Sequence, residues 1–200
     1  MAGPSASSSA FDETLTGFVE AIAAETPAPG GGSVSAVVTT MAAGLVAMVA
    51  RFSRAHWDEA AGAVCQADAL RARAAPLAQE DADAYEAVLT AMRMPKELEP
   101  EVRNALIGDA LSRAADVPIR IAETAADVAE LAATLAELGN PNLRGDAAAA
   151  ALLSEAAARA AANLVEINLA TSEGDDRVDR ARAVAAAAGA AAERALAAGP

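Results

Sequence analysis

The sequence predicts an all-α protein: a multihelical array of five to six helices with a buried central helix. Composition is the first reason, because 61 of the 200 residues are alanine and only 2% are aromatic, which favours helices over strands. The second is that apolar residues recur at helical spacing in successive segments. The third is an uncharged run at 33–50, which suits a helix surrounded by other helices.

The first predicted helix spans residues 11–25, after a short leader at 1–10 whose composition predicts disorder. Its apolar residues lie on one helical stripe. They are Phe11, Leu15, Phe18, Val19 and Ile22. Pro27 and Pro29 end this helix. Residues 11–198 are expected to form a single domain, since no repeat or long linker interrupts them.

The second helix is expected to begin near Ser33 and to end at about Phe52. The uncharged run within it reaches the length of roughly 18 residues at which a membrane span becomes a candidate. However, the run contains two serines, two threonines and many alanines, and the other predicted helices are amphipathic. We therefore predict that this helix is buried at the centre of the array. A single membrane span remains the alternative.

Two longer helical patterns follow, from 58 to 92 and from 101 to 138, with a turn at 93–100. Pro76 and Pro118 lie inside these patterns and predict a kink or break in each.

The sequence GNPN at 139–142 is expected to end the second of these patterns, with Gly139 in a left-handed cap and Pro141 blocking continuation. The last two helical patterns span 146–170 and 175–198.

Charge and cysteine content exclude several classes of function. The net charge is −13 and no Lys/Arg cluster is present, so no nucleic-acid partner and no anionic membrane surface is expected. The sole cysteine, Cys65, permits no internal disulfide and fits a reducing, cytoplasmic location. One histidine and one cysteine do not build an ordinary zinc site, so no metal is expected.

The glycine triplet Gly30, Gly31 and Gly32, followed by Ser33, precedes the apolar helix. One interpretation is a site for an anion or a polar ligand group, formed by the free N–H groups of the helix start with no Cβ in the way. The other is a tight turn that lets two backbones pass closely. The triplet alone leaves both open.

Acidic and amide side chains supply the remaining candidates. Asp81 and Tyr85 share one helical face at i and i+4, where a carboxylate beside an aromatic ring can have a raised pKa suited to acid–base work. The alternative is a solvated acidic face. Asp146 stands where a helix N-cap belongs. Asn163 and Asn168 lie in an apolar helix, where they either tie helices together or line a polar pocket.

Six segments occur in an order that resembles the cyclodeaminase/cyclohydrolase family of folate one-carbon metabolism. They are TPAPGGGS (26–33), MVARFS (48–53), DADAYEAVLTAMRMPK (81–96), ADVPIRIAE (115–123), GNPNLRGD (139–146) and EINL (166–169). The resemblance covers about residues 11–196. It implies an all-helical subunit that works as a homodimer, and reactions that need neither a metal nor a bound cofactor.

The resemblance implies one or both of two reactions. One hydrolyses 5,10-methenyltetrahydrofolate to 10-formyltetrahydrofolate. The other closes the ring of 5-formiminotetrahydrofolate with loss of ammonia. A different class of function, a catalytically silent helical assembly protein, stays open, because RAHWDEA at 54–60 replaces the lysine-rich stretch of many members.

From the residues and the resemblance together we hypothesise the following roles. Asp81 transfers the proton, and Asp146 and Asn168 orient the reacting part of the folate. The remaining predicted substrate contacts are Gly30, Gly31, Gly32, Ser33, Tyr85 and Asn140, with Arg51, Arg54, Lys96 or Arg144 meeting the carboxylates of the glutamate tail.

Overall fold

The structure is a computed structural model that describes residues 11–95, 99–170, 172 and 174–199. The predicted leader at 1–10 and Lys96 lie outside these residues. The helices are α1 (Leu15–Ala23), α2 (Gly31–Phe52), α3 (Ala60–Ala74), α4 (Leu77–Met92), α5 (Pro100–Ala114), α6 (Asp116–Leu138), the 3-10 turn η1 (Pro141–Leu143), α7 (Arg144–Asn168) and α8 (Asp176–Ala197). No strand occurs among the described residues, so the all-α prediction is confirmed.

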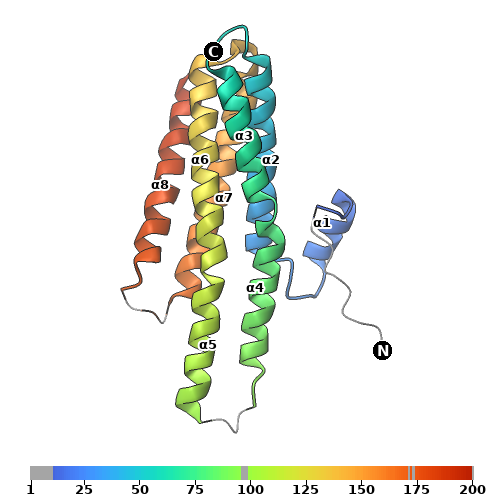
Figure 1. Cartoon of the computed structure of the whole chain (residues 1–200), viewed down its shortest axis with the longest axis vertical. Helices are drawn as coiled ribbons and strands as arrows, with labels where there is room; N and C mark the ends of the chain where they lie inside the picture. The colour runs from blue at the N-terminus through green and yellow to red at the C-terminus, as the bar shows by residue number, and fades with distance from the viewer. Residues whose placement is uncertain (1–10, 96–98, 171, 173, 200) are drawn as a thin grey trace.

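Figure 1 shows an elongated bundle in which α3 continues into α4 along one line and α5 continues into α6 along another. The breaks fall near the two predicted prolines. Pro76 is the N-cap of α4, and Pro118 lies in the first turn of α6, where its missing N–H removes no helical hydrogen bond. The helices α2, α7 and α8 run alongside these two lines, and α1 lies to one side of them.

Alanine dominates the core, and this lets the helices pack closely. The helix α6 packs against α2, α3, α4, α5, α7 and α8, so it occupies the middle of the bundle. The second helix is buried where α2 packs against α3, α4, α6 and α7, as predicted, but the central position predicted for it belongs to α6. Of the described helices, α2 alone is long and apolar enough to cross a membrane, and 61% of its most apolar window is buried inside the protein.

One side of α2 remains partly open. Apart from Arg51, its less buried residues are apolar or glycine and recur every three or four positions. This stripe, called the α2 stripe below, comprises Val34, Val37, Val38, Met41, Gly44, Leu45, Met48 and Phe52. Met41 is 55% exposed and Phe52 is 64% exposed.

The predicted helix at 11–25 is shorter, and its apolar stripe is not in the core. Thr14 is the N-cap of α1 and accepts a hydrogen bond from the N–H of Gly17 (3.0 Å). Phe18 is buried, whereas Leu15 and Val19 are 69% and 55% exposed. Amphipathic spacing therefore predicted a helix correctly but not what covers it, since little of the chain packs on this side.

Gly139 ends α6 as expected, but the predicted left-handed cap is wrong. Its φ is −80°, a value that any residue adopts. A Cβ at this position would instead meet the carbonyl oxygen of Leu135 and the hydroxyl of Ser53. The glycine is therefore required because a side chain would collide with the last turn of α6 itself and with Ser53 at the end of α2.

Candidate functional site

A cavity of about 280 Å³ lies where the start of α2, the face of α4, the α5–α6 break and the end of α7 meet. Most of its walls are apolar, and Asp81 is the one charged side chain among the described residues that line it. The lining comprises Pro27, Ala28, Gly30, Gly31, Gly32, Asp81, Ala84, Tyr85, Ala114, Pro118, Leu164, Ile167 and Asn168. An apolar cavity with a few convergent polar groups is typical of a small-molecule site.

Ser33 fixes the carboxylate of Asp81. The backbone N–H of Ser33 donates to Oδ2 of Asp81 (2.8 Å), so α4 supplies an acceptor for one of the unpaired N–H groups at the start of α2. The Ser33 hydroxyl lies 2.8 Å from the carbonyl oxygen of Ala78 and 3.1 Å from the same Oδ2. Among the described residues no group donates to Oδ1, so this oxygen is left for a ligand.

Gly32 is required by the same contact. A Cβ on Gly32 would overlap the carboxylate of Asp81, whereas a Cβ on Gly31 would meet nothing within 4 Å. The close-approach interpretation of the glycine triplet is therefore confirmed at Gly32, and the ligand-site interpretation stays a prediction. Gly32 permits the close approach, and the described residues offer no acceptor to the N–H groups of Gly31 and Gly32 beside the cavity.

Burial raises the pKa of Asp81 above its usual value, and the hydrogen bonds from the side chain and backbone of Ser33 oppose that rise. The carboxyl group therefore holds its proton to a higher pH than an exposed aspartate does. A group tuned in this way, with one oxygen fixed and one available, can accept and return a proton. Tyr85 lines the same cavity, as the i, i+4 spacing predicted.

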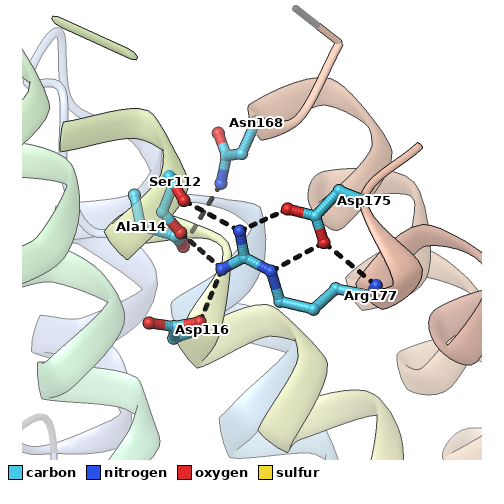
Figure 2. A network of polar contacts seen from close by, with 6 residues as sticks. All are labelled: Ser112, Ala114, Asp116, Asn168, Asp175 and Arg177. Atoms are coloured by element: carbon cyan, nitrogen blue, oxygen red, sulfur yellow. Dashed lines mark hydrogen bonds and ion pairs between the residues drawn. The ribbon is translucent and has the colours of Figure 1, made fainter. Parts of the chain in front are cut away.

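The opposite wall contains Asn168 at the end of α7. Its Nδ2 donates to the carbonyl oxygen of Ala114 (3.3 Å), so Asn168 both joins two helices and lines the cavity. Figure 2 shows this bond beside a network centred on Arg177. Asn163 is exposed instead, so the prediction that it shares an apolar environment with Asn168 is wrong.

Five predicted site residues lie at the other end of the bundle: Arg51, Arg54, Asn140, Arg144 and Asp146. Arg51 forms an ion pair with Asp68 (2.6 Å). The backbone N–H of Asn140 donates to the Ser53 hydroxyl (2.8 Å), and its side-chain Nδ2 donates to the carbonyl oxygen of Phe52 (3.2 Å).

Asp146 lies in the first turn of α7, whereas Asn168 is its last residue. At about 1.5 Å per residue, about 33 Å separate Asp146 from Asn168 along this helix. Within one chain the structure therefore does not bring Arg51, Asn140 or Asp146 to the cavity.

The sequence missed the apolar lining from α5, α6 and α7, because Ala114, Pro118, Leu164 and Ile167 resemble ordinary core positions. No group of three or more His, Cys, Asp or Glu among the described residues could hold a metal ion.

A protein-family profile described as formiminotransferase-cyclodeaminase matches residues 14–193. The chain is similar to a methenyltetrahydrofolate cyclohydrolase from Methylorubrum extorquens, with 32% identity over 167 residues, which cover 80% of each protein. It is also 32% identical over 169 residues to the formimidoyltransferase-cyclodeaminase of Mus musculus. That match covers 80% of this chain and 31% of the mouse protein.

Among solved structures, the chain is similar to the formiminotetrahydrofolate cyclodeaminase of Thermotoga maritima. The TM-score is 0.83 at 28% sequence identity, and the superposition covers 93% of this chain and 95% of the other.

The contact between Gly32 and Asp81 yields a direct prediction. Gly32→Ala should displace the Asp81 carboxylate and lower the free energy of unfolding by about 1–3 kcal/mol, as overpacking does. Gly31→Ala is the matched control, because its Cβ enters open space. Thermal unfolding measures stability, and carboxyl-carbon NMR titration of Asp81 reports its environment. Equal behaviour of the two variants would show that the close approach does not constrain Asp81.

Proposed function

The chain belongs to the formiminotransferase-cyclodeaminase family, and we propose that it is a folate one-carbon enzyme. It hydrolyses 5,10-methenyltetrahydrofolate to 10-formyltetrahydrofolate, cyclises 5-formiminotetrahydrofolate with release of ammonia, or does both. The observation that supports the proposal is the half-buried Asp81, the one carboxylate among the described residues that line a mostly apolar cavity. The methenyl carbon lies in a cationic amidinium, and a carboxylate nearby stabilises that charge.

In the hydrolytic reaction Asp81 acts as a general base. Its free oxygen, Oδ1, accepts a proton from a water molecule as the water oxygen attacks the methenyl carbon. The proton then passes to N5 as the bond from that carbon to N5 breaks, and the hydroxyl of the adduct loses its remaining proton to solvent as the C=O forms, which leaves the formyl group on N10. Ser33 contributes by holding Oδ2 in place.

In the cyclisation the formimino group is protonated (=NH2+), N10 attacks its carbon, and Asp81 accepts the proton that N10 loses, which leaves an –NH2 group on that carbon. The same carboxyl group then returns the proton to the departing nitrogen, which leaves as ammonia. Asp81 can act first as a base and then as an acid because its raised pKa lies closer to neutral pH than that of an exposed aspartate. The proposal includes no resident metal or cofactor.

The cavity walls suggest how the folate is held. The free N–H groups of Gly31 and Gly32 can donate to the polar edge of the pterin, and Tyr85 and Ile167 offer apolar surface to its faces. The side chain of Asn168 can accept or donate at the reacting end.

Replacing Asp81 tests the chemistry. Asp81→Asn should lower kcat at least about a hundredfold in a methenyltetrahydrofolate absorbance assay or an ammonia-release assay, with a metal chelator present. In the unsubstituted protein the rate should rise with pH through the raised pKa of Asp81, because only the carboxylate accepts a proton. That dependence should be absent from Asp81→Asn.

The matched control is Asp83→Asn, which makes the same charge change at an exposed position of α4 and should retain full activity. A folded Asp81→Asn variant with full activity would remove Asp81 from the role of base. If the unsubstituted protein accelerates neither reaction and binds neither folate, a catalytically silent assembly protein becomes the better interpretation.

The proposed enzyme is a homodimer that pairs through the α2 stripe and the exposed side of α1. Both surfaces are apolar, and the described chain leaves them open. Gly44 lies in the middle of the stripe, and a Cβ there would meet nothing within 4 Å. A second copy can therefore approach α2 closely at this point. A twofold pairing would use the same stripe on both copies.

Gly44→Glu should convert the dimer into a monomer, because it places a charge at the centre of the apolar contact without meeting any atom of its own chain. Gly62→Glu is the matched control, since Gly62 is an exposed glycine of α3 that also has open space around it. Light scattering after size-exclusion chromatography gives the mass of each. A Gly44→Glu variant with the mass of the unsubstituted dimer would place the interface elsewhere.

If the two α2 helices of the dimer run antiparallel, Asn140 and Asp146 of the second copy approach the cavity of the first. This arrangement predicts complementation between inactive variants. Asp81→Asn mixed with Asp146→Ala after reversible dissociation should recover up to about a quarter of the full activity, since half of the dimers are mixed and each has one intact site. Mixtures that stay inactive would show that no site combines these two residues from different copies.

A further inference from the structure

Arg177 occupies the first turn of α8 and uses every donor of its guanidinium group. Nε donates to Oδ1 of Asp175 (3.0 Å), and one terminal nitrogen donates to Oδ2 of the same carboxylate (2.6 Å) and to the Ser112 hydroxyl (2.8 Å). The other terminal nitrogen donates to the carbonyl oxygen of Ser112 (2.8 Å) and to Oδ1 of Asp116 (2.7 Å). A guanidinium has five N–H groups, so none is left over.

These bonds hold the α5–α6 break against the start of α8 (Figure 2). Ser112 belongs to the last turn of α5 and Asp116 begins α6, so Arg177 grips the chain on both sides of Ala114. Hydrogen bonds from Arg177 lower the pKa of Asp175 to about 2, which keeps this carboxylate charged at neutral pH.

Ala114 connects the hydrogen bonds of Arg177 to the cavity. It lines the cavity, and its carbonyl oxygen accepts the hydrogen bond from Nδ2 of Asn168. In Figure 2 the amide nitrogen of Asn168 points toward Ala114, and the amide oxygen lies on the other side. The orientation of this amide therefore depends on the position of Ala114.

We propose that Arg177 is a positioning residue for the reaction: it fixes the α5–α6 break and thereby sets the orientation of Asn168 toward the bound folate. This inference rests on the proposed function. A lysine keeps the charge of Arg177 but has three donors on one nitrogen, so it does not reproduce the planar, five-bond grip.

A double-mutant cycle tests this. Arg177→Lys should lower kcat/KM at least about tenfold, and Asn168→Ala should lower it at least as much. In the double variant kcat/KM should be no more than about threefold below that of Asn168→Ala alone, because a residue that acts through Asn168 has no further effect once the amide is gone.

Arg194→Lys is the matched control. Arg194 also lies on α8 and also joins it to α6, through Glu137 (3.1 Å) and Glu130 (2.7 Å), but none of these residues lines the cavity. This variant should keep kcat/KM within about twofold of the unsubstituted value. Two results would overturn the positioning role. One is a double variant in which the losses of kcat/KM from Arg177→Lys and Asn168→Ala multiply. The other is a loss of kcat/KM in Arg194→Lys as large as that in Arg177→Lys.

NMR of the Asn168 side-chain amide gives a result that does not depend on turnover. Its nitrogen and proton resonances should shift in Arg177→Lys and stay in place in Arg194→Lys. Unchanged resonances in Arg177→Lys would overturn the inference even in a protein that proves inactive. An inactive unsubstituted protein whose Asn168 resonances respond as expected would instead refute the proposed function alone.

Discussion

The hydrogen bonds between Ser33 and Asp81 join the start of α2 to α4, and the cavity depends on this link. A carboxylate near the positive end of a helix dipole is favoured by the dipole, yet burial dominates and raises its pKa. The site thus keeps a group whose charged form is costly. Oδ2 accepts the bond from the backbone N–H of Ser33 and Oδ1 remains open, so the same link that orders the two helices also prepares one oxygen for chemistry.

The alanine-rich core explains why the cavity lies near the ends and breaks of helices. Along the middle of the bundle α6 is surrounded by other helices, and small side chains let them approach too closely to leave space for a ligand. Space and unpaired backbone groups occur together where a helix begins, ends or breaks. The start of α2, the break at Ala115 and the end of α7 meet at one level of the bundle. The cavity therefore forms because a helix start, a helix break and a helix end lie next to one another.

The sequence predicted the parts of the site that depend on local spacing. Asp81 and Tyr85 share a face because they are one turn apart, and the glycine triplet precedes α2 because glycine and proline exclude an earlier helical start. Contacts between distant segments were not predictable in this way. The bond from Ser33 to Asp81 spans 48 positions, and helical periodicity does not say which faces of two helices meet. Arg177 was missed for the same reason, since its bonds to Ser112 and Asp116 reach 65 and 61 positions along the chain.

At each end of the bundle a glycine allows a polar side chain from another helix to approach closely, but the hydrogen bonding differs between the two ends. At one end Gly32 admits the carboxylate of Asp81, and at the other Gly139 admits the hydroxyl of Ser53. At the Gly139 contact the Ser53 hydroxyl has both a donor and an acceptor: it accepts a hydrogen bond from the N–H of Asn140 and donates to the carbonyl oxygen of Val49. The Gly32 contact leaves Oδ1 and two glycine N–H groups available beside a cavity. The two family motifs therefore differ within one chain: the GNPN segment ties the end of α6 to the end of α2 with satisfied hydrogen bonds, and the glycine triplet leaves backbone donors beside the cavity.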